Sequence, residues 1–460
     1  MKKTAGFLIP ALIMASPAAV QAGGFSLNEQ SASAMGVANA GTAANPENAT
    51  TVFFNPAGMS QLKGTNLSFG AAALSIDAAM KPGTGGATRD NGQPVAGTHG
   101  GDIADLAVLP NVYLTHELND WLDVGFGLHA PYGLAADYDD RFVGRFFADE
   151  TELKAIAFSP SIALNDGAGF SLGFGVNLMY AEGTLTKFQD YSATEAKLAA
   201  LGAKLDDGYA DISGEDLAVT FSFGLLWALN ERTQLGLSGQ SGTELKLKGD
   251  ARIHNFPVVD LSAPSVTQQL VTERVEVPLQ IPESLTVGLR HRVSDRVTLL
   301  AGATWSKWSR FEALDIVSRE SPGPVSGNVG GGLGDPALVA HISENWQDTW
   351  QVNLGGIWQA TPEWAFKAGY AYDQSPVNDN FRTARIPSGD REWLTLGARY
   401  AHLQSGWTVD VAAGVLLFDD TRVDERNYNV NNQPMPGAAR FSGTYELDAW
   451  SAGVQFSKAF

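Results

Sequence analysis

The chain has 460 residues, of which 44% are hydrophobic, 18% are charged and 50 are glycine, so it is too apolar for a disordered protein and has no collagen-like repeat. Its 31 basic and 50 acidic residues give a formal charge of −19, the wrong sign for a protein that wraps phosphate backbones. We therefore expect no nucleic-acid partner. The absence of cysteine excludes a disulfide scaffold and thiolate metal sites.

The N-terminus has the pattern of a secretory signal peptide. Lys2 and Lys3 precede an apolar stretch, and Val20-Gln21-Ala22 offers small residues for cleavage. We predict a signal peptide over residues 1–22. Beyond it we find no run of 18 apolar residues, the minimum for a transmembrane helix. The exported chain is therefore either soluble or a membrane β-barrel, and the strand pattern must decide.

Strict alternation of apolar and small or polar residues recurs along the chain. From Leu217 to Leu229 every odd position is large and apolar, which predicts a strand with one apolar face. Repeated segments of this kind with aromatic ends are typical of outer membrane barrels. The pattern predicts fourteen strands, near 66–78, 102–117, 122–137, 150–165, 170–188, 216–230, 233–255, 274–293, 297–318, 348–361, 363–376, 391–403, 407–420 and 440–460.

The connections between these strands alternate in length. Six are tight and polar, such as Asn119-Asp120 and Asn165-Asp166-Gly167, and the ones between them are long. Short turns on one rim and long loops on the other are characteristic of a transmembrane barrel. We therefore predict an all-β fold, a 14-stranded antiparallel transmembrane β-barrel over residues 66–460, in the Gram-negative outer membrane. A secreted β-sandwich or solenoid is the soluble alternative.

A segment without strand alternation precedes the first strand. Residues 23–65 are rich in Ala, Gly, Ser and Asn, and a lumen this wide is either an aqueous channel or plugged. We predict that this segment is an N-terminal hatch. Within it Pro56 fixes its own φ and keeps Asn55 out of the helical region, although Asn-Pro alone is an ordinary turn signal.

Several stretches resemble one known family. GGFSLNEQSASAMGVANAGTAA, NPENATTVFFNPAGM, VGFGLHAPYGLAADY, TWSKWSRFEAL and DQSPVNDNFRTARIPSGDREWL are similar, in order, to the FadL-type long-chain fatty acid and hydrocarbon transporters of the outer membrane. The resemblance covers nearly the whole mature chain. It implies passive uptake of long-chain fatty acids or similar hydrophobic compounds, and a hatch that includes Phe25, Asn55, Pro56 and Ala57.

The resemblance also implies a capture groove on two exterior loops. Leu198, Leu201 and Leu205 fall at i, i+3 and i+7, on one face of a predicted helix. Such a stripe ordinarily packs onto its own protein. The resemblance gives these leucines, with Phe256 and Val259 on another loop, the role of first collecting substrate.

One basic residue is implied as a contact for the substrate carboxylate. Lys187 stands at the end of the fifth strand, where a lysine is ordinarily a solvated rim charge, and it matches a basic position of the family's deeper site. The family's second basic contact is not reproduced, since His341 and Ile342 stand near its place. A neutral or aromatic hydrocarbon therefore remains an alternative substrate.

The third strand carries a break. Pro131, Tyr132 and Gly133 interrupt it, because proline removes a ladder donor and glycine weakens pairing, which predicts a bulge or inward kink. The resemblance implies that this kink opens a lateral exit through which substrate reaches the outer membrane.

No motif for catalysis or metal binding is found. The seven histidines are scattered without HExxH, GxSxG is missing, and Gly330 to Asp335 is interpreted as a flexible loop. We expect no enzyme activity, no cofactor and no metal. The expected partners are the hydrophobic ligand, outer membrane lipid and lipopolysaccharide, with the chain a monomer. A general porin and an adhesive barrel remain as rivals.

Overall fold

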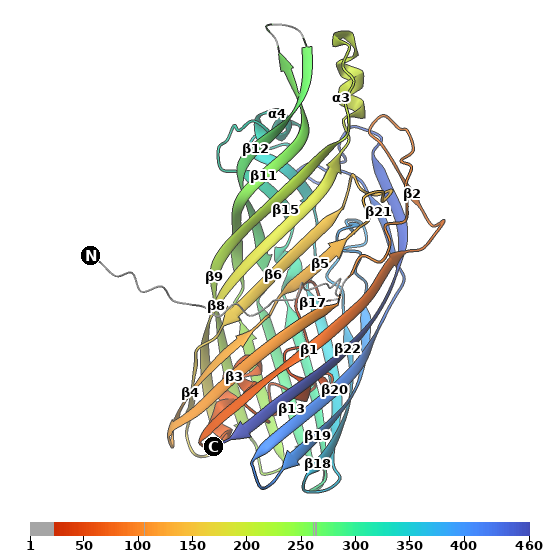
Figure 1. Cartoon of the computed structure of the whole chain (residues 1–460). Coiled ribbons are helices and arrows are strands. Elements are labelled where there is room, and N and C mark those ends of the chain that lie inside the picture. Colours follow the sequence, from red (N-terminus) through yellow and green to blue (C-terminus); the bar gives the residue numbers. More distant parts are fainter. Residues whose placement is uncertain (1–22, 105, 261, 263–264) are drawn as a thin grey trace, which may run out of the picture.

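A computed structural model describes residues 23–460 except 105, 261, 263 and 264, so the predicted signal peptide lies outside the described residues. Fourteen antiparallel strands close into a barrel, which confirms the predicted fold class. Figure 1 shows the tilted strands, with short turns at one end and the long connections at the other. Among the described residues, no helix is long and apolar enough to cross a membrane.

Several of the fourteen strands are divided into two segments. In chain order the strand segments are β1 (Thr65–Met80), β2 (Gly86–Thr88), β3 (Ala107–Asn119), β4 (Leu122–His129), β5 (Gly133–Asp137), β6 (Glu150–Phe158), β7 (Ser161–Asn165), β8 (Phe170–Gln189), β9 (Gly208–Ala228), β10 (Thr233–Gln240), β11 (Thr243–Asp260), β12 (Ser265–Ile281), β13 (Ser284–Arg292), β14 (Val297–Ser306), β15 (Ala313–Ser318), β16 (Leu338–Ser343), β17 (Thr349–Gln359), β18 (Trp364–Asp373), β19 (Arg391–His402), β20 (Trp407–Phe418), β21 (Thr421–Glu425) and β22 (Arg440–Ala459).

The helical segments are few and short. They are α1 (Ala32–Met35), α2 (Thr51–Phe54), η1 (Pro56–Gln61), α3 (Ser192–Lys197), η2 (Ala199–Leu201), η3 (Trp308–Arg310) and α4 (Ser326–Leu333).

The period of two in the sequence places large apolar side chains on the outer wall. Leu285, Trp305 and Trp350 occupy one row across three neighbouring strands, in direct register. Trp350 is 51% exposed, which is expected for a side chain that faces lipid rather than a protein core. The tryptophans mark the outer edge of this band, because aromatic rings favour the membrane interface.

The first and last strands form the seam of the barrel. β1 pairs with β22 from Asn66↔Ala459 to Met80↔Tyr445. The amide of Phe460 then donates to the carbonyl of Thr65 at 2.8 Å. No sheet edge is left open at the seam, because every register pair of this stretch is formed.

The largest differences between the predicted and the observed strand boundaries are on the side of the long loops. The sixth strand begins at Gly208, the eighth at Ser265 and the tenth at Leu338, each earlier than predicted. In the added parts of β9 and β12 the outward positions are mostly polar, such as Asp211, Ser213, Thr267 and Gln269, so the apolar alternation ends while pairing continues. Phe256 and Val259 therefore lie on β11, in a long hairpin with β12, and the prediction that they lie on a loop is wrong.

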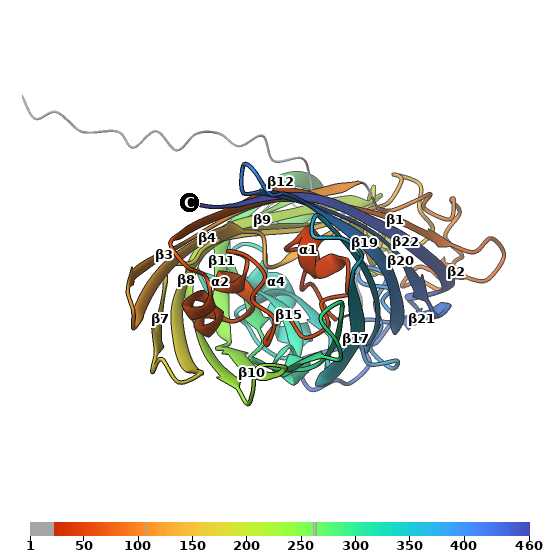
Figure 2. The ribbon, with the colours of Figure 1, turned by 90° about the horizontal axis from the view of Figure 1, so that it is seen from below.

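The N-terminal segment, residues 23–64, lies inside the ring of strands, as the view along the barrel in Figure 2 shows. Asn55 joins it to the wall, since its Nδ2 donates to the carbonyl of Leu225 on β9 at 3.1 Å. The same Nδ2 donates to the carbonyl of Ala43, within the segment, at 2.6 Å. Gly173 on β8 permits this approach, since a Cβ there would overlap the backbone of Ala57.

A cluster of four charges, two of them buried and two partly buried, holds the same segment on the other side. Glu47 accepts from Lys367 on β18 at 2.7 Å and from Arg399 on β19 at 3.0 Å. Both cations also contact Asp410 on β20. Two positive and two negative groups balance, which is the condition for burying charges at tolerable cost.

Candidate functional site

Phe25 lies at the centre of an aromatic cluster in the lumen. Its ring centroid is 4.6 Å from that of Trp308, 5.8 Å from Trp346, 5.9 Å from Tyr132 and 6.1 Å from Phe311. The contacts with Trp308, Tyr132 and Phe311 are edge-on, the geometry that aromatic pairs prefer. Residues from three strands thus converge on one side chain of the N-terminal segment.

Breaks in the wall bring these rings inward. The third strand is interrupted between β4 and β5, the ninth between β14 and β15, and the tenth between β16 and β17. Tyr132, Trp308 and Trp346 all stand in these interruptions and are buried. A continuous strand would have kept alternate side chains in the wall, so the breaks are what build the cluster.

An apolar cavity lies beside Phe25 on the side of the long loops, with about 620 Å³ of empty space, part of it open to solvent. Its wall is mostly aliphatic, with carbon-rich side chains from six or more strands. The lining includes Phe25, Leu134, Leu153, Leu185, Ile212, Leu247, Val277, Leu279, Phe311, Leu314 and Ile386. A pocket of this chemistry accommodates an alkyl chain or an aromatic hydrocarbon.

Arg385 is a cation in the lining of this apolar cavity. Its Nη1 donates to Thr151 Oγ1 at 2.8 Å, and its Nη2 donates to the carbonyl of Thr186 at 2.7 Å. Within the described part of the chain, its Nε has no hydrogen-bond partner although it is buried. An unsatisfied charged donor beside an apolar cavity is a place where an anionic group gains energy.

Glu344 is the acid of the same lining. It stands in the break between β16 and β17, and its Oε2 accepts from Trp346 Nε1 at 2.8 Å. Burial raises the pKa of Glu344 to about 8. The carboxyl group is therefore largely neutral at pH 7, and Glu425 and Asp149 act on the charge of Arg385 more strongly than Glu344 does.

Lys187 lies elsewhere. It lines a separate polar cavity with about 420 Å³ of empty space, part of it open to solvent, together with His341, Ile342 and Glu425. Lys187 thus lies beside His341 and Ile342, which stand near the place of the family's second basic contact, but the cavity that they share is not the apolar one. The binding role of Lys187 stays a prediction.

The leucines with a predicted capture role lie at the end with the long loops. α3 ends at Lys197 and η2 at Leu201, where Gly202 adopts φ 67°, so Leu198, Leu201 and Leu205 do not share one helical face and that prediction is wrong. Leu201 is 38% exposed.

Hydrogen bonds bring the leucine loop to the hairpin of β11 and β12. The amide of Asp206 donates to Gln268 Oε1 at 2.9 Å, and Gln268 Nε2 donates back to the Asp206 carbonyl at 2.8 Å. Gln268 pairs with Pro257 on β11, next to buried Phe256. The two predicted capture segments are therefore adjacent in space.

The interrupted third strand bonds to the N-terminal segment. Leu27 N donates to the Pro131 carbonyl at 3.0 Å, and Gly133 N donates to the Phe25 carbonyl at 2.9 Å. On the wall side, β3 pairs with β4 only as far as Val112, so residues 107–111 have no ladder partner on that side among the described residues. Residues 25–27 thus supply partners that a neighbouring strand would ordinarily provide.

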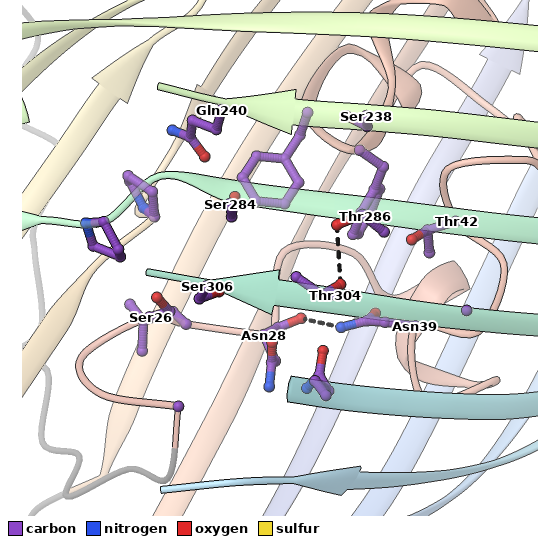
Figure 3. A pocket seen from close by; sticks show the side chains of 18 of the residues that line it. Ser26, Asn28, Asn39, Thr42, Ser238, Gln240, Ser284, Thr286, Thr304 and Ser306 are labelled. Carbon is purple, nitrogen blue, oxygen red and sulfur yellow. Dashed lines mark hydrogen bonds between the residues drawn. The ribbon is translucent and has the colours of Figure 1, made fainter. Parts of the chain in front are cut away.

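Below Phe25 lies a second, polar cavity, shown in Figure 3. It has about 1330 Å³ of empty space, part of it open to solvent. Hydroxyl and carboxamide side chains from β10, β13 and β14 face the N-terminal segment across it. Those labelled in Figure 3 are Ser26, Asn28, Asn39, Thr42, Ser238, Gln240, Ser284, Thr286, Thr304 and Ser306.

Sequence reasoning missed Arg385, Trp308 and Phe311 as site residues. Arg385 lies within RIPSGD, a stretch that carries the family resemblance, but its side chain could not be assigned to a pocket. Trp305, Trp308 and Phe311 are spaced by three rather than two, a visible sign that the ninth strand leaves the wall. Within the described residues, no three His, Asp or Glu side chains gather as a metal site requires.

These features define an outer membrane β-barrel with an apolar pocket in its lumen and a cationic group in that pocket. The family model described as "Outer membrane protein transport protein (OMPP1/FadL/TodX)" matches residues 13–460, and the chain belongs to this family. It is therefore an outer membrane transport protein of the Gram-negative type, as predicted.

Three comparisons illustrate the relationship. The chain is 30% identical over 414 residues to the 47 kDa outer membrane protein of Pasteurella multocida, covering 87% of this chain and 89% of that protein. It is 26% identical over 448 residues to the long-chain fatty acid transport protein of Salmonella typhi, covering 95% and 94%. The crystal structure of a Pseudomonas aeruginosa FadL homologue matches the fold with a TM-score of 0.82, over 95% of this chain and 99% of that one, at 23% identity.

Proposed function

We propose that the protein takes up long-chain fatty acids or similar hydrophobic compounds passively across the outer membrane, with residues 23–65 acting as its hatch. The observation that carries this proposal is the double role of Phe25: its ring closes the apolar pocket, and its carbonyl holds the interrupted third strand. We further propose that the barrel works as a monomer surrounded by lipopolysaccharide.

Capture is the first step. The leucine loop and the hairpin that bears Phe256 and Val259 are hydrogen-bonded to each other outside the membrane band. Apolar side chains exposed there gain energy when they contact a substrate tail.

Transfer to the pocket is the second step. Each buried CH₂ group contributes about 0.8 kcal/mol, so a long acyl chain has enough binding energy to displace one phenylalanine ring. The unpaired Nε of Arg385 would then receive the carboxylate, with Lys187 as a basic contact on the way from the exterior.

Release is the third step. Withdrawal of residues 25–27 removes the hydrogen bonds to Pro131 and Gly133. Substrate would then leave sideways beside Pro131, Tyr132 and Gly133. A lateral exit suits an apolar solute because it avoids transfer through water.

A neutral or aromatic hydrocarbon is the second candidate substrate, since the aliphatic lining suits it equally. The buried charge of Arg385 favours an acid, because a neutral ligand would leave its Nε unsatisfied.

Ligand extraction tests the proposal. The protein is purified in a detergent unlike any fatty acid, and bound molecules are identified by mass spectrometry, alongside Arg385→Ala and Lys187→Ala variants. Fatty acids that diminish in a variant support the acid-binding role. Neutral hydrocarbons that persist in both variants would move the substrate class, and an empty lumen that conducts ions would contradict transport of hydrophobic compounds.

A further inference from the structure

The wall has a second interruption, between the eighth and ninth strands. β12 pairs with β15 only at Val275 and Glu276, and β13 pairs with β14 only from Ser284 onward. Residues 277–283 therefore have no ladder partner on the ninth strand among the described residues. One backbone hydrogen bond crosses there, from Lys307 N to the Glu283 carbonyl at 2.9 Å.

The cause is the departure of the ninth strand from the wall. Residues 307–312 form the short η3 turn and direct Trp308 and Phe311 onto Phe25 in the lumen. The segment that would have sealed the eighth strand is thus used to build the aromatic cluster.

Polar side chains cover the interruption. Arg310 Nη1 contacts Glu283 Oε1 at 2.8 Å, and Arg310 Nη2 donates to Gln280 Oε1 at 3.3 Å. The Arg310 and Glu283 side chains are 29% and 38% exposed. An ion pair this exposed contributes only about 0–1 kcal/mol, so the cover opens at small cost.

Both cavities reach this part of the wall. Leu279, Phe311 and Leu314 line the apolar cavity, while Pro282 and Trp308 line the polar one. Apolar side chains therefore lie directly behind the exposed pair of Arg310 and Glu283.

The interruption stands at the level where a portal would meet the outer leaflet. It begins directly beyond the row of Leu285, Trp305 and Trp350 at the edge of the apolar band. The third-strand break likewise begins directly beyond Phe158, which is exposed on the same band. Both breaks therefore lie near the headgroup level, where a charged cover is soluble.

We propose that the wall between β12 and β15 is a second lateral portal for the apolar or amphiphilic ligand, and that the contacts of Arg310 with Glu283 and Gln280 hold it closed. The inference rests on the proposed uptake function. Phe25 packs against Trp308 and Phe311, which flank Arg310 on one turn. Displacement of Phe25 by a ligand therefore weakens the contacts of Arg310 at the same time as it frees the third strand.

Site-specific sealing tests the portal, because the natural chain has no cysteine. A cleavable thiol cross-linker joins Gln280→Cys to Arg310→Cys in one full-length variant. In a second variant it joins Val108→Cys to Ala135→Cys, across the third-strand break. A control seal replaces the ion pair between Lys63 and Glu117, away from both breaks. Uptake of radiolabelled oleate is measured in cells that lack their own transporter, with heat-modified gel migration as the check of folding.

The portal predicts that the third-strand seal alone leaves part of the uptake, and that adding the second seal removes the remainder until the cross-linker is cleaved. The control seal should leave uptake unchanged. Two results would overturn the portal but keep the function. One is that the third-strand seal alone lowers uptake to that of cells with the empty vector. The other is that the second seal causes no loss of uptake, whether or not the third-strand seal is present. Absence of uptake by the unmodified protein would overturn both.

Discussion

The carbonyl oxygen of Phe25 accepts a hydrogen bond from the amide of Gly133 at 2.9 Å, although the two residues are more than a hundred positions apart. The ring of the same Phe25 lies 4.6 Å from that of Trp308. One residue thus connects the break in the third strand with the break in the ninth. Any ligand that moves this ring acts on both places in the wall.

Replacing Phe25 with alanine should free the start of the N-terminal segment. Loss of a buried phenylalanine costs about 3–5 kcal/mol, more than the few hydrogen bonds of residues 25–27 can offset. Hydrogen exchange should rise in residues 23–30 and stay unchanged in β1. Phe54→Ala, on the other end of the segment, is the matched control, and equal exchange in both variants would contradict the role of Phe25.

Replacing Arg385 with leucine should weaken fatty acid binding. A charge-assisted hydrogen bond contributes about 1.5–3 kcal/mol, which corresponds to a roughly tenfold to hundredfold loss of affinity. Calorimetry with oleate and with its methyl ester separates the charge effect from the apolar effect. The ester should bind both proteins alike; a similar loss for acid and ester would mean that Arg385 only shapes the cavity.

Glu29 should make the N-terminal segment sensitive to pH. Burial raises the pKa of Glu29, partly offset by Arg391, with Asp373 adding to the rise. Neither of its carboxylate oxygens has a hydrogen-bond partner among the described residues. The stabilisation is complete at low pH, where the carboxyl is protonated in any state, and is lost as the pH rises through the raised value.

Hydrogen exchange of residues 23–30 measures this effect across a pH series, after correction for the intrinsic rate. Protection should fall with rising pH in the natural protein and stay constant in Glu29→Gln, which mimics the protonated acid. A variant with the same pH dependence would assign the effect to another group.

Removing Glu47 should destabilise the remainder of the segment. Its loss leaves Lys367 and Arg399 with only Asp410 inside the barrel, and breaking a buried ion pair costs about 3–5 kcal/mol. Glu47→Gln should lower the midpoint of thermal unfolding. Lys63→Ala, which removes an ion pair that is 70% exposed on the lysine side, should change stability by about 1 kcal/mol or less. Equal effects of the two variants would show that the cluster contributes no more to stability than an exposed ion pair does.

The sequence predicts the barrel well because alternation is a local property. In β9, each large apolar residue at an odd position from Leu217 to Trp227 indicates by itself which way its side chain points. The departure from alternation at Pro131 also marks a real break in the strand, since proline acts on its own backbone.

Contacts between distant segments are what sequence reasoning could not supply. Gly330 and its neighbours were expected to form a flexible loop, yet they lie in α4, and that expectation is wrong. The helix starts against β12: Glu273 Oε2 accepts from the amides of Val325 and Ser326, the latter at 3.0 Å. A carboxylate fifty residues away stabilises those amides, and no local pattern indicates it. The place of Arg385 in the apolar pocket is hidden for the same reason.

The register between β1 and β22 constrains the order in which the molecule is assembled. β1 follows directly on the N-terminal segment, and it pairs with β22, the strand farthest from it along the sequence. The cylinder can close only after β22 reaches β1. By then residues 23–64 must already be enclosed, with the charges of Glu47 and its partners matched, since a closed wall gives a folded segment no way in. The N-terminal segment must therefore be in place when β22 pairs with β1. A chain that failed to place it there would form a barrel with an open lumen.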